Sequence, residues 1–395
     1  SVGNTVTTGS VTIPMMKKTG YKPEFAGAVE AAASTGGQIM PPIMGAAAFL
    51  MAEYMNIPYA KVAVKAILPA VLYFTGIFIA VHLEAKKLGL RGLSRDELPK
   101  FSVLVKKIYL LLPLIVLVVL VSNGTRTMQS AAAIAILVTI AVGIINADNR
   151  INFTKCIDAL EAGGKGTITV AAACAMAGIV AGCITSTGLA SKLLRAIVSA
   201  SGGRAIVALF LTMICCIVLG MGVPTTANYC IMAATCAPIL MNEEIGIPML
   251  AAHFFVFYFG IVADITPPVA LAAYAGSAIA KAPPMRTALN ATRLAIGAFI
   301  VPYIFALNPK MLFIDAQWYE VVMITITALI GMFGMAAGLG GYIFRNMKVI
   351  ERIMCIAGGL TLLIPGSITD IIGLVLVGAV CVIQYGDAKK TKAAA

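Results

Sequence analysis

Residues 205–241 read AIVALFLTMICCIVLGMGVPTTANYCIMAATCAPILM and contain no Lys, Arg, Asp or Glu. As one straight helix these 37 residues would extend roughly 55 Å, whereas the hydrocarbon core of a bilayer is about 30 Å thick. The middle of the stretch, from Gly220 to Asn228, gathers glycine, proline and short polar residues, which end helices. We therefore predict a re-entrant hairpin with its tip at 220–228, in a place where protein or a wet cavity surrounds the non-helical backbone.

A second overlong apolar run, 245–280, is interrupted by Asp264 and by the adjacent prolines Pro267 and Pro268. Each proline removes a backbone donor and clashes with the preceding turn of a helix. This run is therefore predicted to be a discontinuous helix that unwinds near the middle of the membrane. Together the two runs indicate an all-α integral membrane protein.

The composition agrees, because it requires lipid as part of the solvent. The chain of 395 residues is 60% hydrophobic and 12% charged, with a mean hydropathy of +0.96; a water-soluble globular chain is far less apolar. Lys and Arg, which give the net charge of +12, cluster in short connectors between apolar runs. This is the positive-inside pattern of membrane proteins, and it argues against nucleic acid as a partner. Membrane lipid is the expected surrounding.

The first 60 residues repeat the layout of 205–310. At an offset of 226, the double proline Pro41 and Pro42 aligns with Pro267 and Pro268, and at an offset of 224 the Asn at position 4 aligns with Asn228. The base of the first hairpin carries three Lys residues, whereas the base of the second carries two Glu residues. Opposite charge at the two bases predicts inverted repeats, with the hairpins entering from opposite sides.

The repeats divide the chain into four predicted parts, which are 1–60 (first repeat), 61–204 (connecting and scaffold helices), 205–310 (second repeat) and 311–395 (C-terminal membrane helices). Within the scaffold, we expect 150–164 to lie as an amphipathic segment on the cytoplasmic surface and 167–190 to cross the membrane. The positively charged connector after 190 conflicts with the predicted orientation, so we expect an interfacial helix there. The end of the chain, 353–386, is predicted to break at Pro365 and Gly366.

The two tips and two breaks are the predicted ion and substrate site. Secondary transporters use such places because half-helix N-termini attract anions, while unwound carbonyls and half-helix C-termini coordinate a cation. The candidate residues are Ser1, Gly3, Asn4, Thr5, Gly36, Gly37, Gln38, Met40, Gly220, Gly222, Thr225, Thr226, Asn228, Asp264 and Thr266.

Asp264 is the most specific of these candidates. A carboxylate in mid-membrane costs roughly 2.5–3.5 kcal/mol on insertion scales, so it is expected to coordinate Na⁺ or carry a proton. The alternative is that it caps the half-helix that follows. Glu30, inside the crossing 24–55, raises the same question, with a structural hydrogen bond as the alternative. The small residues at the tips could equally serve close helix packing.

Other chemistry is not indicated. Residues 163–167 contain a GGKGT string, but the spacing of a phosphate-binding loop is absent and no strand precedes it. His82 and His253 have no Cys or carboxylate at ligand spacing, and the nine Cys lack metal-site spacing. We therefore expect no cofactor, no metal beyond a Na⁺ site, and no enzyme.

Several strings of the first repeat resemble a known family. They are TGSVTIP at 8–14, GYKPEF at 20–25, EAAASTGGQIMPP at 30–42 and GAAAF at 45–49, and the second double proline followed by Val269 is similar. These strings resemble the large membrane subunit of tripartite ATP-independent periplasmic (TRAP) transporters, and most of all the fused membrane protein that works with a TAXI-type solute-binding protein. The resemblance covers roughly residues 1–310.

The resemblance implies an elevator-type transporter with an ion-transporter-superfamily-like fold in the inner membrane of a prokaryote. It implies Na⁺ as the coupling ion, an organic acid as substrate and a periplasmic TAXI-type binding protein that delivers it. Family sodium sites map around Asn4, Gly37, Thr225, Asn228 and Thr266. The region equivalent to the small subunit is missing here, and the chain begins at Ser1 inside a motif, so we expect an N-terminally truncated piece of a longer protein.

Two questions stay open at this level. H⁺ remains the alternative to Na⁺, because Asp264 or Glu30 could carry a proton. A membrane-embedded channel or enzyme is the alternative to a coupled transporter; an enzyme would need a convergent cluster of catalytic side chains, and a channel would conduct without coupling.

Overall fold

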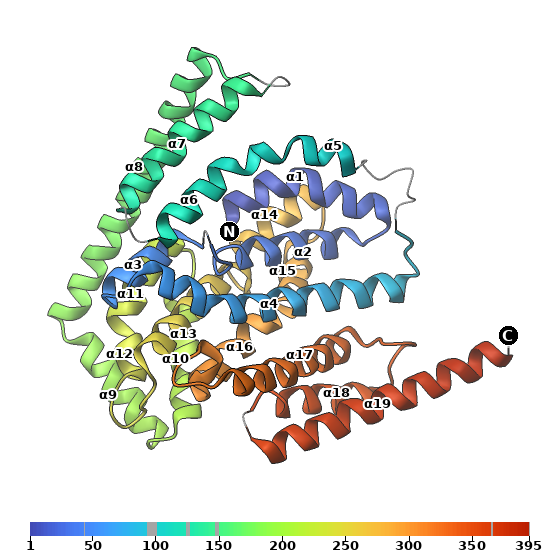
Figure 1. Ribbon diagram of the computed structural model, residues 1–395. Helices are drawn as coiled ribbons and strands as arrows, with labels where there is room; N and C mark the ends of the chain where they lie inside the picture. Colours follow the sequence, from blue (N-terminus) through green and yellow to red (C-terminus); the bar gives the residue numbers. More distant parts are fainter. Residues whose placement is uncertain (43, 93–100, 124–126, 147–149, 365, 395) are drawn as a thin grey trace.

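The computed structural model describes residues 1–42, 44–92, 101–123, 127–146, 150–364 and 366–394, and over these residues the regular structure is helical. Figure 1 shows α7 and α8 as a long arm on one side, and α17, α18 and α19 as a layer on another. Between them lie α1, α2, α14 and α15. The α-helices are α1 Val2–Thr19, α2 Pro23–Gly36, α3 Ala46–Tyr54, α4 Tyr59–Leu88, α5 Phe101–Lys106, α6 Leu112–Ser122, α7 Met128–Ile145, α8 Phe153–Ser186, α9 Leu189–Ser201, α10 Ala205–Gly220, α11 Thr225–Thr235, α12 Ala237–Leu240, α13 Met249–Val262, α14 Leu271–Ala280, α15 Pro284–Leu294, α16 Ile296–Leu307, α17 Trp318–Gly340, α18 Val349–Thr361 and α19 Ser367–Ala394.

Both overlong runs break where the sequence predicts. The run 205–241 folds as α10, a non-helical tip at 221–224, and then α11 and α12. The run 245–280 folds as α13, a single 3₁₀ turn η2 (Ala263–Ile265) and α14, with non-helical residues before α14 begins. In the tip, Gly222 has a φ of 74°, a left-handed conformation that favours glycine.

The internal repeat is visible in the helix boundaries. Shifted by 226 residues, α2 coincides with α13 at both ends, and α3 lies within α14. Even the unusual backbone repeats, because Met44 and Ala270, also 226 apart, have φ values of 48° and 38°. Both double prolines contain a cis peptide bond. The two copies therefore share their local geometry, including the region of each break.

The copies pack reciprocally. The hairpin helix α1 of the first repeat packs on α14 of the second, and the hairpin helix α11 of the second packs on α3 of the first. A close approach is made by Gly27 on α2 and Gly276 on α14, where a Cβ added to Gly276 would lie 2.6 Å from the Gly27 carbonyl oxygen. Small residues permit such direct backbone contact between membrane helices.

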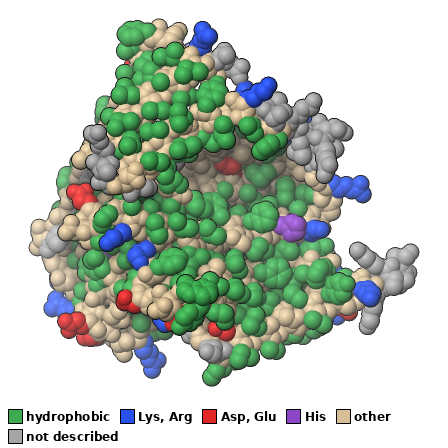
Figure 2. Space-filling model, viewed as in Figure 1, with side chains coloured by type: hydrophobic (Ala, Val, Ile, Leu, Met, Phe, Trp, Pro, Cys, Tyr) green, Lys and Arg blue, Asp and Glu red, His purple; other side chains and the backbone are tan. Residues whose placement is uncertain are grey.

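The core centres on α13, in which every residue from Leu250 to Val262 is buried. Outside this core the surface is strongly apolar: Figure 2 shows hydrophobic side chains over most of the visible face. Among the residues that the structure describes, four helical stretches are long and apolar enough to cross a membrane by length and composition, namely Tyr59–Leu88, Pro284–Leu307, Trp318–Gly340 and Ile368–Lys389. An apolar exterior around a buried central helix is the arrangement expected of a protein surrounded by lipid.

One prediction for the scaffold is wrong. The segment 150–164 is not separate from the next crossing, because α8 runs without interruption from Phe153 to Ser186. The three glycines at 163, 164 and 166 do not end the helix, and an ion pair of 2.5 Å between Lys165 and Glu161 joins successive turns across them. The basic connector after it does form a separate helix, α9.

The C-terminal segment breaks near Gly366, as predicted, into α18 and α19. A polar cluster fastens these helices to the end of α17. The Arg345 guanidinium donates to Glu351 Oε1 at 2.6 Å and to Asp387 Oδ2 at 2.7 Å, and Gln384 donates to Glu351 Oε2 at 2.6 Å. Because charge-assisted hydrogen bonds of this kind have fixed geometry, the three helices form one unit, which packs through α17 on α4.

The contact between Gly27 and Gly276 generates a stability prediction. In Gly276→Val the side chain would meet the α2 backbone, so the two repeats would separate; overpacking of this kind costs about 1–3 kcal/mol. The melting temperature of the purified protein in detergent should fall. The matched control is Gly378→Val on α19, where an added Cβ has nothing within 4 Å and the melting temperature should not change. Equal melting temperatures for the two variants would contradict this packing.

Candidate functional site

The first tip reaches the second break. Ser1, directly before α1, donates its hydroxyl to Asp264 Oδ2 in the 3₁₀ turn η2. Asp264 is only 8% exposed, so its carboxylate is enclosed by protein. Residues 263 positions apart are thereby joined, and the predicted pairing of a tip with a break is present for this pair.

Each tip asparagine bonds to the helix that precedes the break of its own repeat. Asn4 donates from Nδ2 to Ser34 Oγ at 3.0 Å, and Asn228 donates from Nδ2 to the Gly260 carbonyl oxygen at 2.9 Å. Ser34 and Gly260 are themselves 226 residues apart, so the two acceptors occupy equivalent positions, a side-chain hydroxyl in the first repeat and a backbone carbonyl in the second. The asparagines therefore hold each hairpin against the helix beside it.

Three buried polar atoms near the tips and breaks have no hydrogen-bond partner among the described residues. They are Asn228 Oδ1 at the second tip, and Thr35 Oγ1 and Gln38 Nε2 at the first break. Asn228 is 1% exposed. A buried polar atom without a partner loses about 1–3 kcal/mol of desolvation free energy, and such atoms mark places where a ligand would restore the lost interaction.

The candidate glycines have different roles. A Cβ on Gly36 would lie 2.3 Å from Tyr73 Cε1, and one on Gly220 would lie 2.7 Å from Asn228 Nδ2. Gly36 and Gly220 are therefore required for close packing, which is the alternative role that the sequence allows for the small residues of the candidate site. A Cβ on Gly37 would lie 3.3 Å from the Ser34 carbonyl oxygen, whereas a Cβ on Gly3 or on Gly222 would have nothing within 4 Å.

The remaining candidates lie at the same helix ends. Thr5 is buried and donates to the Ser1 carbonyl oxygen at 3.1 Å; Thr266 donates to the Val262 carbonyl oxygen at 2.8 Å. Met40 is half-buried in the first break, and Thr225 is the half-buried first residue of α11. The hydroxyls of Thr5 and Thr266 are therefore engaged with their own helical turns.

A large cavity adjoins the second tip. It has a volume of about 1160 Å³ and is bounded by α3, the start of α4, the end of α6 and Thr226 of α11. Polar side chains in its wall include Glu53, Tyr59, Lys61 and Gln129. Sequence reasoning selected Thr226 but missed the others, which come from connectors whose meeting depends on the tertiary fold. The one available signal was the polar cluster that separates α3 from α4.

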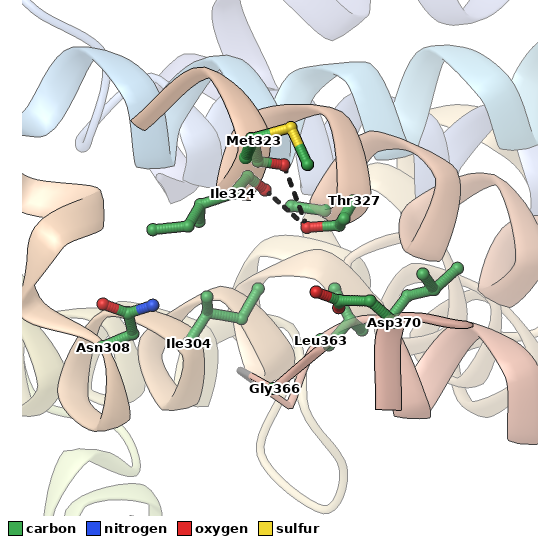
Figure 3. Close-up of a pocket in the computed structure, with 10 residues that line it drawn as sticks. Ile304, Asn308, Met323, Ile324, Thr327, Leu363, Gly366 and Asp370 are labelled. Carbon is green, nitrogen blue, oxygen red and sulfur yellow. Dashed lines mark hydrogen bonds between the residues drawn. The ribbon is translucent and has the colours of Figure 1, made fainter. Parts of the chain in front are cut away.

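A smaller cavity of about 90 Å³ lies away from the tips, between α16, α17 and the start of α19. Figure 3 shows the carboxylate of Asp370 beside it, with Thr327 and Asn308 on other parts of the wall. Thr327 donates its hydroxyl to the carbonyl oxygens of its own helix. None of the predicted site residues lines this cavity, so it is separate from the candidate site.

Glu30 is buried on α2, one helical turn before Ser34, and accepts a hydrogen bond of 3.2 Å from the Ser34 hydroxyl. It is thus linked through Ser34 to Asn4 at the first tip. Repeated helices with hairpin tips, unwound breaks and unpaired polar atoms define a class of protein, the secondary transporters that use discontinuous helices.

The chain belongs to the family of the tripartite ATP-independent periplasmic transporter, DctM component, whose model matches residues 1–319. Comparison with curated proteins finds no match. The family is one of transporters and not of enzymes, and its members are integral inner-membrane components that work with a periplasmic solute-binding protein and a small subunit. The predicted TRAP large subunit and its all-α membrane fold are confirmed.

The enclosed carboxylate at the second break generates a prediction. Asp264→Asn keeps an acceptor for the Ser1 hydroxyl but removes the negative charge, so uptake by the complete transporter in proteoliposomes should fall about tenfold or more, equivalent to ~1.4 kcal/mol. Asp315→Asn, an exposed position before α17, is the control and should transport normally. Unchanged uptake and ion dependence in the first variant would reduce Asp264 to a helix cap.

Proposed function

We propose that this chain is the permease portion of a sodium-coupled importer of an organic acid, which a periplasmic TAXI-type binding protein delivers. The two repeats would form the moving part of an elevator-type transporter, and 61–204 would form most of the scaffold. The family membership supports the transporter class. The observation that carries the finer proposal is the unpaired Asn228 Oδ1 at the second tip.

A sodium ion suits this position because of the atoms around it. Na⁺ is a hard cation that takes oxygen ligands, and unwound helix segments supply carbonyl oxygens. Asn228 holds its amide nitrogen on the Gly260 carbonyl oxygen, which leaves Oδ1 as an acceptor only. Gly220, which directly precedes the tip 221–224, lies close to both Asn228 and Ala263 of η2, because a Cβ added to Gly220 would meet both residues. Asn228 is therefore near both non-helical segments. Oxygen ligands from two broken segments could therefore converge.

Removal of that oxygen should weaken sodium binding. In Asn228→Ala, the sodium concentration for half-maximal uptake should rise about tenfold, corresponding to ~1.4 kcal/mol, while uptake at saturating sodium remains measurable. Asn290→Ala, at a half-exposed position on α15, is the control and should keep the normal sodium dependence. The measurement is initial uptake by the complete transporter with its binding protein in proteoliposomes. An unaltered sodium response in Asn228→Ala would exclude this ligand.

The large cavity beside the second tip is the proposed place for the organic acid. The N-terminus of α11 opens at Thr225, next to cavity-lining Thr226, and helix N-termini favour anions. Lys61 in the cavity wall supplies a positive charge for a carboxylate. The cavity is large enough for a small organic anion, and it lies between α3, the start of α4, the end of α6 and Thr226 of the second repeat.

The charge of Lys61 is tested through substrate affinity. Lys61→Gln should raise the KM for a carboxylate substrate roughly tenfold to a hundredfold, because a hydrogen bond to a charged group contributes about 1.5–3 kcal/mol. Lys22→Gln, exposed at the start of α2, should leave KM unchanged. If both variants keep the normal KM, the anion binds elsewhere. Ionic current without a sodium requirement would instead favour a channel.

A further inference from the structure

Glu30 occupies a polar site between α1 and α2. Its side chain is 7% exposed, and three hydroxyls contact its carboxyl group. Thr8 bonds to Oε1, Thr12 bonds to Oε2 at 2.5 Å, and Ser34 bonds to Oε1 at 3.2 Å. The threonines lie one turn apart on α1, so both face the same point on α2. The hydroxyls enclose both carboxyl oxygens.

No cation balances this carboxyl group among the described residues. The helices and turn packed on α2 are α1, α4, α14, α15 and η2, and their ionisable groups are bonded elsewhere or make no bond with Glu30. Three of these groups donate to backbone carbonyl oxygens, namely Lys17 to Ala280, Tyr73 to Ala32 and Tyr274 to Pro268. Arg293 forms an ion pair with Glu84, and Asp264 accepts a hydrogen bond from Ser1. Among the described residues, no hydrogen bond or ion pair joins Glu30 to Lys18, Glu24, His82, Lys281 or Arg286. An uncompensated carboxylate inside a membrane is unfavourable by roughly 2.5–3.5 kcal/mol.

The threonine hydroxyls also contact backbone carbonyl oxygens of their own helix. The Thr8 hydroxyl contacts the Asn4 carbonyl oxygen at 2.8 Å, and the Thr12 hydroxyl contacts the Thr8 carbonyl oxygen at 3.0 Å. Each threonine therefore lies between a backbone carbonyl oxygen and a carboxyl oxygen of Glu30. A protonated Glu30 would be able to donate to a threonine whose own hydrogen bonds to the backbone.

The second repeat shows that the fold does not require this cluster. The residues equivalent to Thr8, Thr12, Glu30 and Ser34 are Met232, Cys236, Val256 and Gly260. The replacement is structural as well, because a Cβ on Gly260 would lie 3.1 Å from Met232 Sδ. Apolar residues thus fill the position in one repeat that a carboxyl group and three hydroxyls fill in the other. A purely structural account leaves this difference unexplained.

We propose that Glu30 is a proton-binding site, and that the proton bound there crosses the membrane with the moving repeats as a second coupling ion. The proposal rests on the proposed transport function. Binding forms the O–H bond of the acid. Release breaks that bond and passes the proton to water, and the carboxylate then accepts hydrogen bonds from the Thr8 and Thr12 hydroxyls. Thr8 and Asn4 are exposed at the edge of the cluster. Through Ser34 and Asn4 the site adjoins the first tip.

The test uses the complete transporter with its binding protein in proteoliposomes, driven in separate arms by a sodium gradient or by a proton gradient alone. Wild type should respond to both gradients. Glu30→Gln, which imitates the neutral acid, should keep the response to sodium and lose at least tenfold of the response to protons. A proton response that persists in Glu30→Gln, or that is absent from wild type, would overturn the proposal; absence of the sodium response in wild type would instead overturn the proposed function.

A second variant covers the case in which Glu30→Gln fails to fold. Thr12→Val removes a hydroxyl that stabilises the carboxylate, while the neutral acid can still donate to Thr8. The pH profile of proton-driven uptake should therefore change. Thr7→Val, exposed on α1 and bonded to the Gly3 carbonyl oxygen, is the control and should keep the normal pH profile. Identical profiles for these two threonine variants would exclude Glu30 as the titrating group.

Discussion

The structure depends on one constraint, that backbone polar groups inside hydrocarbon need partners within the protein. The breaks meet this constraint by short local bonds and by burial. Gly45 donates its N–H to the Gln38 carbonyl oxygen at 3.0 Å, and Ala270 donates to that of Thr266 at 3.2 Å. The amide of Asn228 satisfies Gly260 from a different helix. Because such bonds require close neighbours, each unwound segment lies where several helices meet.

Much of the fold could be predicted from the sequence, since helix length and helix breakers are local properties. The 37-residue charge-free run had to fold back, and the double prolines had to interrupt their helices. The continuity of α8 was not predictable in the same way, because three nearby glycines favour a break and the helix nevertheless continues through them. Helix propensity is a weak guide when neighbouring interactions compete with it.

The site was predictable only in part, for a physical reason. Helix ends and tips follow from composition, which placed Asn228 and Asp264 among the candidates. Whether a polar atom is left without a partner depends on tertiary contacts, as do the meeting of Ser1 with Asp264 and that of Thr12 with Glu30. Lys61 was missed because its cavity is assembled from segments far apart in the chain. The two repeats thus agree in backbone and differ in side-chain chemistry.

The direct contact of Gly27 with Gly276 has a consequence for the architecture. With no side chains between them, the two backbones shield each other from lipid, and each repeat forms part of the wall that encloses the other. Neither half could be cut away without exposing peptide groups that have no solvent to receive them. Whatever displacement these helices undergo in the bilayer, the two halves must make it together as a single rigid block.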